Sequence, residues 1–515
     1  MRNNRTKAVM VNSSLAVSAQ LVNLILNFVV RTLLIKSLGS EVNGLNGLFS
    51  NVVNILSFAE LGIGSAISYS LYKPLAEGDQ IQISAIMQLF KKIYDFVATF
   101  VAVVGIIISF FITVFIHGDN HGVGNVQIAF LLFISNVVFS YLMSYKRTLL
   151  IANQQGYIDS LNRMLFTFIS QLVQIIGLIF FPNYYLFLVI QSLTTVVSNL
   201  PILKRVKSDF PFLNTYRNSN VDSKTIKYLK KNVAGMLSFK MGNIIILGTD
   251  NILLSSFLGL NVVGMYANYT LIITGFTTLM NSLVNSITSS IGNLASDGNE
   301  KKERKVFLQF NMVNSVLAFT VGMGLITFFP IFIKLWLGTK FVLTDVVTFI
   351  IVMNFFVAQL RNGLINYLNA YGLYWEQRYK SFFEATTNLI VSLVLITQTN
   401  LGIEGVLVGT LTAYLLVDFV WEPKIVMNYA IKVNLKAFYT WYGSQILFGA
   451  ALFYFAQMFT TDFLLDSNLL LQVFVIGIQS IVFALVFYLL QKFVARAVRL
   501  DVGNFKFIFN RLKHR

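Results

Sequence analysis

The chain has 515 residues, of which 56% are hydrophobic and only 12% are charged. Because an ordinary soluble domain carries about 25% charged residues, this composition excludes a mainly water-exposed surface and indicates an integral membrane protein. The net charge is +17, but the lysines and arginines avoid the apolar segments, which argues against nucleic acid as their partner, and the lack of cysteine excludes disulfides and thiol chemistry.

Apolar segments long enough to cross a bilayer recur along the whole chain. A spanning helix needs about 20 mainly apolar residues, so the pattern predicts an all-α integral membrane protein with about 14 transmembrane helices. Most connecting loops are short, and neighbouring helices are therefore expected to run antiparallel. The predicted spans are residues 11–38, 44–72, 90–116, 126–151, 164–182, 185–203, 232–258, 264–292, 306–333, 344–370, 380–398, 403–424, 438–459 and 468–491.

Basic residues fall almost entirely on one side of this arrangement. If the N-terminus is cytoplasmic, 33 of the 39 lysines and arginines lie in cytoplasmic loops and tails, only Lys334 and Lys340 lie opposite, and four lie within spans. Cytoplasmic loops of membrane proteins carry such an excess of positive charge. The sequence therefore predicts a multi-pass cell-membrane protein with both termini in the cytoplasm.

The second half of the sequence repeats the first at an offset of 220 positions. The shared residues include a turn in which Leu38, Gly39, Val42 and Gly44 match Leu258, Gly259, Val262 and Gly264. Six spans is an even number, so both halves are expected to enter the membrane from the same side, as parallel repeats about a pseudo-two-fold axis. Transporters with a site between two halves use this arrangement, although duplication for fold stability alone is the alternative.

This repeat sets the predicted domain organisation. The predicted parts are an N-terminal six-helix lobe (1–203), a basic cytoplasmic linker (204–231), a C-terminal six-helix lobe (232–430), helices 13 and 14 (431–491), and a basic cytoplasmic tail (492–515). The tail interleaves bases with phenylalanines, which is typical of a segment that contacts anionic membrane lipids, although a simple positive-inside anchor is the alternative.

Polar residues recur at helical spacing within several predicted spans. Side chains three or four positions apart share one face of a helix, and polar groups that face lipid are costly. Interhelical hydrogen bonds explain single asparagines, but stripes in corresponding helices of both halves favour a hydrated central cavity. Candidate substrate-binding residues on these stripes are Asn23, Asn27, Asn54 and Asn243, and the fourth span carries a stripe of Asn136, Ser140, Ser144 and Arg147.

Charged residues inside the spans sharpen this prediction. Arg31, Lys240 and Arg361 outnumber the acids placed near them, and an intramembrane charge is a functional-site hypothesis by default. A cavity with spare positive charge suits an anionic ligand, and the guanidinium group of one arginine can donate hydrogen bonds to two phosphate oxygens at once. Glu60 and Asp250 are candidate ion-coupling residues, although pairing with Arg31 and Lys240 would make all four structural. Glu384 is the nearest candidate partner of Arg361 in sequence.

Enzyme motifs and metal-ligand patterns do not emerge from the sequence. The chain lacks a P-loop, and its three histidines lie in a loop and a tail; His117 and His121 have i,i+4 spacing, but without a helix or an intervening acid a chance pair is the better explanation than a zinc site. We expect neither catalysis nor a bound metal or organic cofactor. Transport without an ATP site requires an ion gradient, such as H⁺ or Na⁺, the membrane potential, or the substrate's own gradient.

Two segments of the first half carry a family resemblance. Residues 31–44 (RTLLIKSLGSEVNG) and 56–66 (LSFAELGIGSA) resemble the polysaccharide-biosynthesis flippases, which are the Wzx-type oligosaccharide translocases of the multidrug/oligosaccharidyl-lipid/polysaccharide exporter superfamily. Residues 332–338 and 401–406 are similar to family segments as well. The resemblance covers nearly the whole chain, and the two extra C-terminal helices distinguish the sequence from the twelve-helix multidrug branch.

The resemblance implies transport of a lipid-linked oligosaccharide. A flippase of this family would move an undecaprenyl-pyrophosphate-linked repeat unit from the inner to the outer leaflet by alternating access, for capsule or exopolysaccharide assembly. Arg31, Lys240 and Arg361 would then hold the pyrophosphate, and the polar stripes would bind the glycan. Polysaccharide polymerase and glycosyltransferases of the same pathway would be its partners. The alternative is an ion-coupled multidrug/cation antiporter of the same superfamily, which predicts a cavity dominated by acids.

Overall fold

The computed structural model describes residues 22–56 except 24, 70–116 except 72, 73 and 76, 124–216 except 154, 249–296, 300–463 except 372, 374, 375 and 378, and 469–502. Across these ranges the regular secondary structure is entirely helical. Within the same ranges, ten helices are long and apolar enough to cross a membrane. The predicted fold class, an all-α membrane protein, is confirmed.

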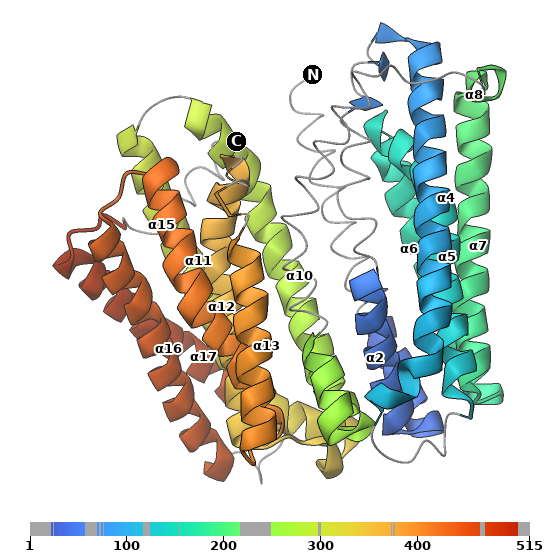
Figure 1. Ribbon diagram of the computed structural model, residues 1–515. Coiled ribbons are helices and arrows are strands. Elements are labelled where there is room, and N and C mark those ends of the chain that lie inside the picture. The colour runs from blue at the N-terminus through green and yellow to red at the C-terminus, as the bar shows by residue number, and fades with distance from the viewer. Residues whose placement is uncertain are drawn as a thin grey trace. The chain divides into compact units, whose positions relative to one another are not determined.

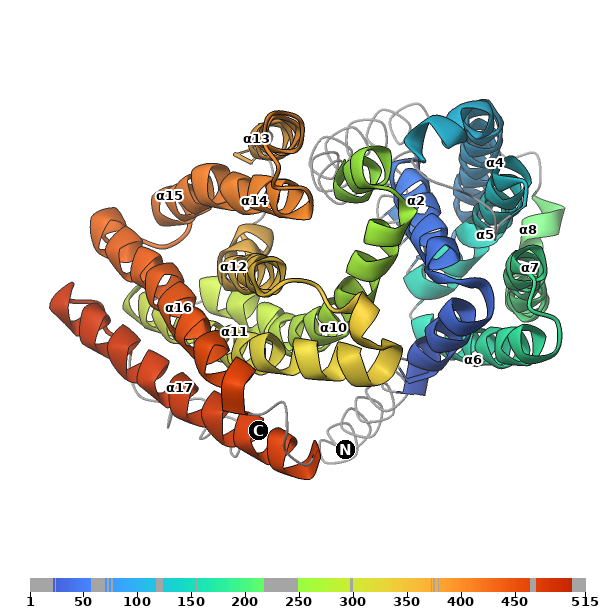
Figure 2. The same ribbon diagram turned by 90° about the horizontal axis from the view of Figure 1, so that it is seen from below.

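The chain forms two compact units, Met1–Gly264 and Met265–Arg515. In the first unit, α4, α5 and α7 run alongside one another, and α6 packs against α5 and α7 (Figures 1 and 2). The helices of this unit are α2 (Ser40–Leu56), α4 (Gln80–Phe111), the 3-10 turn η2 (Ile112–Phe115), α5 (Val126–Ala152), α6 (Gly156–Phe180), α7 (Tyr184–Asp209) and the short α8 (Phe212–Thr215).

The second unit begins within α10 and contains the remaining helices. Here α11 packs against α12, α16 and α17, while α13 and α14 form a close pair (Figure 2). The elements are α10 (Leu260–Ser296), α11 (Glu300–Leu337), η3 (Thr339–Phe341), α12 (Asp345–Ala370), α13 (Lys380–Gln398), α14 (Ile403–Ala413), η4 (Tyr414–Asp418), α15 (Phe419–Tyr429), α16 (Leu435–Phe463) and α17 (Leu469–Ala497).

Side-chain caps explain where several of the long helices begin. Asp79 accepts a hydrogen bond from the amide of Gln82 at the start of α4, and Asn125 accepts from the amides of residues 127 and 128 at the start of α5. Asn183 and Thr344 cap α7 and α12 in the same way. These caps satisfy backbone donors that have no partner within the helix. Helix α4 begins before the predicted span 90–116, at Gln80, and α7 continues past the predicted span 185–203, to Asp209.

The repeat turn predicted from the sequence is present twice in the structure. Gly39 and Gly259 both have positive φ, 96° and 88°, which favours glycine, and α2 and α10 start one residue later, at the same offset of 220. The two helix starts meet reciprocally: a Cβ on Gly44 would lie 2.1 Å from the carbonyl oxygen of Leu260, and one on Gly264 would lie 2.4 Å from that of Ser40. This exchange of equivalent residues is a local two-fold contact.

Polar contacts join the same two helix starts. Ser40 Oγ donates to Asn261 Oδ1 over 2.6 Å, and Asn261 Nδ2 donates to Glu41 Oε1 over 3.1 Å. Asn43 Nδ2 donates to the carbonyl of Gly264 over 3.0 Å. Glu41 and Asn261 are equivalent positions of the repeat, so the contact between them lies on the local axis. The predicted domain boundaries stay predictions: position 203 lies within α7, and position 231 lies among residues 217–248, which are outside the described residues.

Candidate functional site

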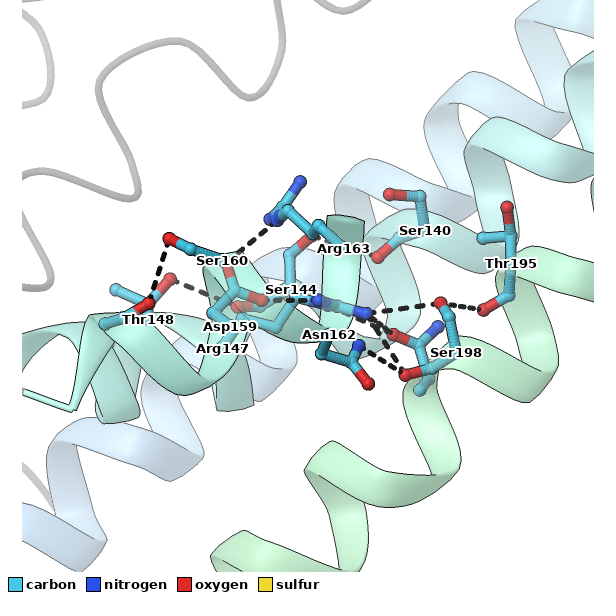
Figure 3. A network of polar contacts seen from close by, with 12 residues as sticks. Ser140, Ser144, Arg147, Thr148, Asp159, Ser160, Asn162, Arg163, Thr195 and Ser198 are labelled. Atoms are coloured by element: carbon cyan, nitrogen blue, oxygen red, sulfur yellow. Dashed lines mark hydrogen bonds and ion pairs between the residues drawn. The ribbon is translucent and has the colours of Figure 1, made fainter. Parts of the chain in front are cut away.

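A polar network fills the space between α5, α6 and α7 (Figure 3). At its centre Arg147, on α5, forms an ion pair with Asp159 of α6 and donates two hydrogen bonds to Asn199 Oδ1 of α7, at 2.8 and 3.1 Å. Asn162 Nδ2 donates to the carbonyl of Ser198 over 2.8 Å. Arg147 is 7% exposed and Asp159 is 5% exposed, so this network replaces water around a buried charge.

A cavity of about 340 Å³ opens beside this network. We call it the N-unit cavity; its volume lies in the range of about 300–1,000 Å³ that is typical of small-ligand sites. Its walls come from α5, α6 and α7, with one residue from the helical stretch 25–38. The lining is hydroxyl and amide side chains, two arginines and one phenylalanine: Asn27, Asn136, Ser140, Arg147, Arg163, Phe166, Thr167, Ser170, Gln171, Gln174, Gln191, Thr194, Thr195, Ser198 and Asn199.

The charges at this cavity sum to a positive value. Arg163 donates to Asp159 Oδ2 over 2.8 Å, so one carboxylate serves both arginines, and the described residues of the network carry +1. The side chain of Arg163 is 62% exposed, whereas that of Arg147 is 8% exposed. Arg147 is therefore held as part of the wall, while Arg163 is accessible to a ligand in the cavity.

The second unit holds a different cluster, which we call the C-unit charge cluster. Its members are Arg361 of α12, Lys380 and Glu384 of α13, Asp418 of η4 and Glu422 of α15, and each is at most 7% exposed. Glu422 Oε1 accepts from Arg361 Nη2 over 2.8 Å and from Lys380 Nζ over 2.6 Å. Glu384 Oε1 accepts from Arg361 Nη1 over 3.2 Å. Glu384 was the predicted partner of Arg361, and this contact is confirmed.

The carboxylates of this cluster outnumber its bases. When all five groups are ionised, two positive and three negative charges leave a net charge of −1. Asp418 Oδ1 lies 2.9 Å from both Arg361 Nη2 and Lys380 Nζ, but its Oδ2 has no hydrogen-bond partner among the described residues and the side chain is 0% exposed. The surplus negative charge of this buried cluster is costly, and a proton on Asp418 Oδ2 would remove it.

The backbone is irregular where Asp418 lies. Residues Tyr414–Asp418 form a single π-helical turn between α14 and α15, and such turns frequently occur at functional sites. Tyr414 places its ring 4.7 Å from the guanidinium carbon of Arg361, a cation–π contact. This turn brings both Tyr414 and Asp418 to the same arginine.

The sequence-predicted site residues are distributed over the molecule. Asn27 lines the N-unit cavity, Asn23 offers its backbone carbonyl to Gln171 at 3.5 Å, and Asn54 is exposed on α2. Arg31 is half-buried in the helical stretch 25–38, and Asp250 is half-buried in the stretch 249–258. Glu60, Lys240 and Asn243 lie outside the described residues, so their assignments stay predictions.

The charge environment of Arg361 differs from the one expected from the sequence. Arg361 was predicted to have spare positive charge for a pyrophosphate, but three carboxylates surround it. Two of these, Asp418 and Glu422, lie 57 and 61 positions further along the chain, on a helix whose pairing with α12 the sequence pattern does not specify.

Two residues at the centres of the networks are absent from the candidate site residues predicted from the sequence. Arg147 and Lys380 fall among the predicted cytoplasmic bases, yet they are 7% and 4% exposed. The signal for Arg147 was its position on the polar stripe of the fourth span, three members of which, Asn136, Ser140 and Arg147, do line the cavity. Lys380 had a signal in Glu384, one helical turn away.

Comparisons with known proteins place the fold. No model of a known protein family matches the chain, and no curated protein is similar enough to count as a relative. Among solved structures, the lipid II flippase MurJ in an inward closed conformation aligns with a TM-score of 0.59 and 14% identity, over 94% of this chain and 99% of MurJ.

Transporters of the MATE family align as well. An inward-facing multidrug resistance MATE transporter of the MOP superfamily gives a TM-score of 0.58 at 13% identity, over 84% of this chain and 96% of its own. A MATE structure in complex with MaD3S gives 0.53 at 14% identity, over 80% and 96%. At these identities the likeness shows the fold: this multi-pass membrane chain has the fold shared by MATE transporters and MurJ.

Proposed function

We propose that the chain translocates an undecaprenyl-pyrophosphate-linked oligosaccharide from the inner to the outer leaflet by alternating access, for surface polysaccharide assembly. In this proposal the protein is a transporter of the cell membrane with both termini in the cytoplasm, and it performs no catalysis. A lipid-linked glycan has many hydroxyls and a negatively charged pyrophosphate, so a suitable site needs hydrogen-bonding side chains and excess positive charge.

The N-unit cavity is the observation that carries this proposal. Its wall contains twelve hydroxyl or amide side chains and two arginines, which is a costly composition inside apolar helices. Interhelical hydrogen bonding alone requires no open volume, whereas this cavity measures about 340 Å³. The shared fold with MurJ, which is described as a lipid II flippase, is consistent with a lipid-linked cargo.

In this proposal, different residues of the N-unit cavity bind different parts of the cargo. Arg163, with its exposed side chain, would contact the pyrophosphate, while Arg147 keeps Asp159 and the wall in place. The glutamines and asparagines would bind sugar hydroxyls. Arg31 and Lys240 remain proposed pyrophosphate ligands, whereas the three carboxylates around Arg361 argue against direct contact of this residue with an anion.

We assign energy coupling to a proton, taken up by the C-unit charge cluster. The cluster carries −1 when fully ionised, and one proton on Asp418 would make it neutral. A sodium ion fits less well, because the ammonium of Lys380 already lies between Asp418 and Glu422, at 2.9 and 2.6 Å. Glu60 and Asp250, the residues expected from sequence, stay as further proposed coupling residues.

Deletion of the gene tests the cargo. The proposal predicts that cells lacking the protein accumulate the lipid-linked oligosaccharide in the cytoplasmic leaflet and lose surface polysaccharide. Re-expression of the wild type should reverse both effects, and Arg163→Gln should reverse them only in part. Normal surface glycan without accumulation, in a strain free of a second flippase, would contradict the proposal.

A cation antiporter is the second candidate function. The net negative charge of the C-unit charge cluster favours this function. An antiporter that exchanges protons for cationic drugs requires an acidic group that binds a proton and a drug cation in turn. This candidate predicts that expression raises resistance to cationic compounds and exports a fluorescent cation in a pH-gradient-dependent manner. Dye export without any change in lipid-linked glycans would establish the antiporter over the flippase.

A further inference from the structure

A second cavity lies at the end of the first unit, where α4, α5 and α7 meet the short helix α8. Its volume is about 870 Å³, and five lysines line it: Lys91 and Lys92 of α4, Lys146 of α5, and Lys204 and Lys207 of α7. The lining contains one acid, Asp95. We call this cavity the lysine pocket; it is separate from the N-unit cavity and shares no lining residue with it.

Over the described ranges, none of the five ammonium groups of the lysine pocket forms an ion pair, whereas the adjacent Arg205, which does not line the pocket, pairs with Asp209 at 2.8 Å. Lys91 and Lys146 lie on different helices, and both line the pocket. Like charges brought together around a cavity repel, and a bound anion would relieve this repulsion.

The remaining wall of the lysine pocket is partly polar and partly apolar. Ser84, which lines the pocket, is 0% exposed, and its Oγ has no hydrogen-bond partner among the described residues. Leu203 and Leu213, which are half-buried, add an apolar surface, together with the buried Met87, Val206 and Phe210. A free inorganic anion gains no binding energy from this apolar surface, whereas the first carbons of an acyl or isoprenyl chain would pack against it.

These features identify the chemistry of the occupant. Lysine binds phosphate as a point charge, and basic pockets between transmembrane helices bind lipid head groups on the cytoplasmic side. The basic-residue bias of the loops predicts that this end of the helices faces the cytoplasm. We propose that the lysine pocket binds the phosphate head group of a membrane lipid, with the lipid chain against its apolar wall.

The position of α8 gives this site a consequence for the protein. Leu213 and Asn214 of α8 line the pocket, and Gln88 Nε2 of α4 donates to the carbonyl of Tyr216 over 3.1 Å. A lipid held in the pocket would therefore fix α8 and Tyr216 against α4.

Lipid binding by the full-length protein tests the proposal without a transport measurement. The purified protein would be incubated in detergent with phosphatidylglycerol, phosphatidylcholine, undecaprenyl pyrophosphate or inorganic pyrophosphate, and retained lipid would be counted by native mass spectrometry. We expect the wild type to retain phosphatidylglycerol or undecaprenyl pyrophosphate at least about fivefold better than phosphatidylcholine. The first result would indicate a bilayer lipid and the second a cargo lipid, and both would support a lipid-phosphate site.

The variant Lys91→Gln/Lys146→Gln/Lys207→Gln should lose this preference. The matched control is Lys301→Gln/Lys302→Gln/Lys305→Gln, which removes the same charge from exposed positions of the second unit and should retain it. Thermal unfolding of both variants verifies that they are folded. Equal lipid retention by the wild type and the pocket variant would overturn the proposal, as would displacement of the lipid by an equal concentration of inorganic pyrophosphate, which would indicate a soluble anion.

This experiment measures lipid binding and not transport. A negative binding result would therefore leave the flippase proposal intact, and a negative transport result would leave the proposed lipid site intact.

Discussion

Each unit of the protein builds a polar network around a buried arginine, but the two networks carry opposite charge. Arg147 in the first unit shares one carboxylate with Arg163 beside an open cavity. Arg361 in the second unit shares three carboxylates with Lys380, and all five groups are buried. The first network has hydrogen-bonding capacity and positive charge for a ligand, whereas the second has a negative charge that one proton neutralises.

In the proposed function, this difference separates two tasks of a coupled transporter. A cargo site must be open and must match the chemistry of the cargo. A proton site needs only a carboxylate whose charge is costly to keep and whose neutralisation changes local packing. The two repeats thus share a turn and a helix start, at Gly39 and Gly259, but their polar interiors differ.

The largest effect is expected from Arg361→Ala. It leaves one base among three buried carboxylates, and breaking a buried ion pair in this manner costs about 3–5 kcal/mol. Thermal unfolding in detergent and the amount of folded protein in membranes measure the loss. Arg361→Ala/Asp418→Asn restores the net charge to −1 and should recover part of the stability. Unchanged unfolding of the single variant would show that the cluster is not a stabilising network.

Arg147→Ala should cost less, about 3 kcal/mol, the lower end of the range for a buried pair. Asp159 keeps Arg163 as a partner at 2.8 Å, and water from the cavity can enter the vacated space. The same unfolding measurement applies, with Arg147→Ala/Asp159→Asn as the matched variant that removes both charges. A loss of stability as large as that caused by Arg361→Ala would contradict the expectation that a network beside an open cavity tolerates the loss of its arginine better than a fully buried one.

Asp418→Asn should leave the fold intact and alter coupling. It makes the cluster neutral without a proton, so the variant should be at least as stable as the wild type at neutral pH. Transport in vesicles with an imposed pH gradient should lose its dependence on that gradient. Glu404→Gln, which removes a carboxylate outside the cluster, is the control. A variant that keeps the full response to the gradient would exclude Asp418 as the coupling residue.

Arg163→Gln should have the smallest effect on stability and a clear effect on function. Its ion pair is 62% exposed on the arginine side, so its removal should cost less than about 1 kcal/mol. Export of lipid-linked glycan should nevertheless fall several-fold, because the accessible positive charge of the cavity is lost. Arg205→Gln, which removes an arginine of another partly exposed pair, should export normally. Equal export by both variants would argue against Arg163 as a cargo ligand.

Much of the architecture could be predicted from the sequence because hydropathy and helical periodicity are local properties. The predicted spans 126–151, 344–370 and 380–398 agree with α5, α12 and α13 within two residues. The offset of 220 predicted that α2 and α10 begin at equivalent turns, and both begin directly after a glycine of positive φ. The stripe on the fourth span likewise predicted side chains that line one cavity.

The charge partners could be predicted only in part. Glu384 lies near Arg361 in sequence and was recognised, whereas Glu422 lies 61 positions away and was not. Basic residues near predicted loops were assigned to topology, since loop bias and buried pairing produce the same pattern in sequence. Arg147 lies only a few residues from a loop, and its burial depends on α6 and α7 packing around it.

The sequence by itself determined that the chain is a membrane protein, that it is helical and that one turn recurs at an offset of 220, because composition, period and offset are properties of the chain alone. The tertiary structure decided which charges neutralise one another and where polar side chains surround open space. Both depend on contacts between helices that are distant in sequence, and the energy of a buried charge is set by the partners that those contacts bring within about 3 Å.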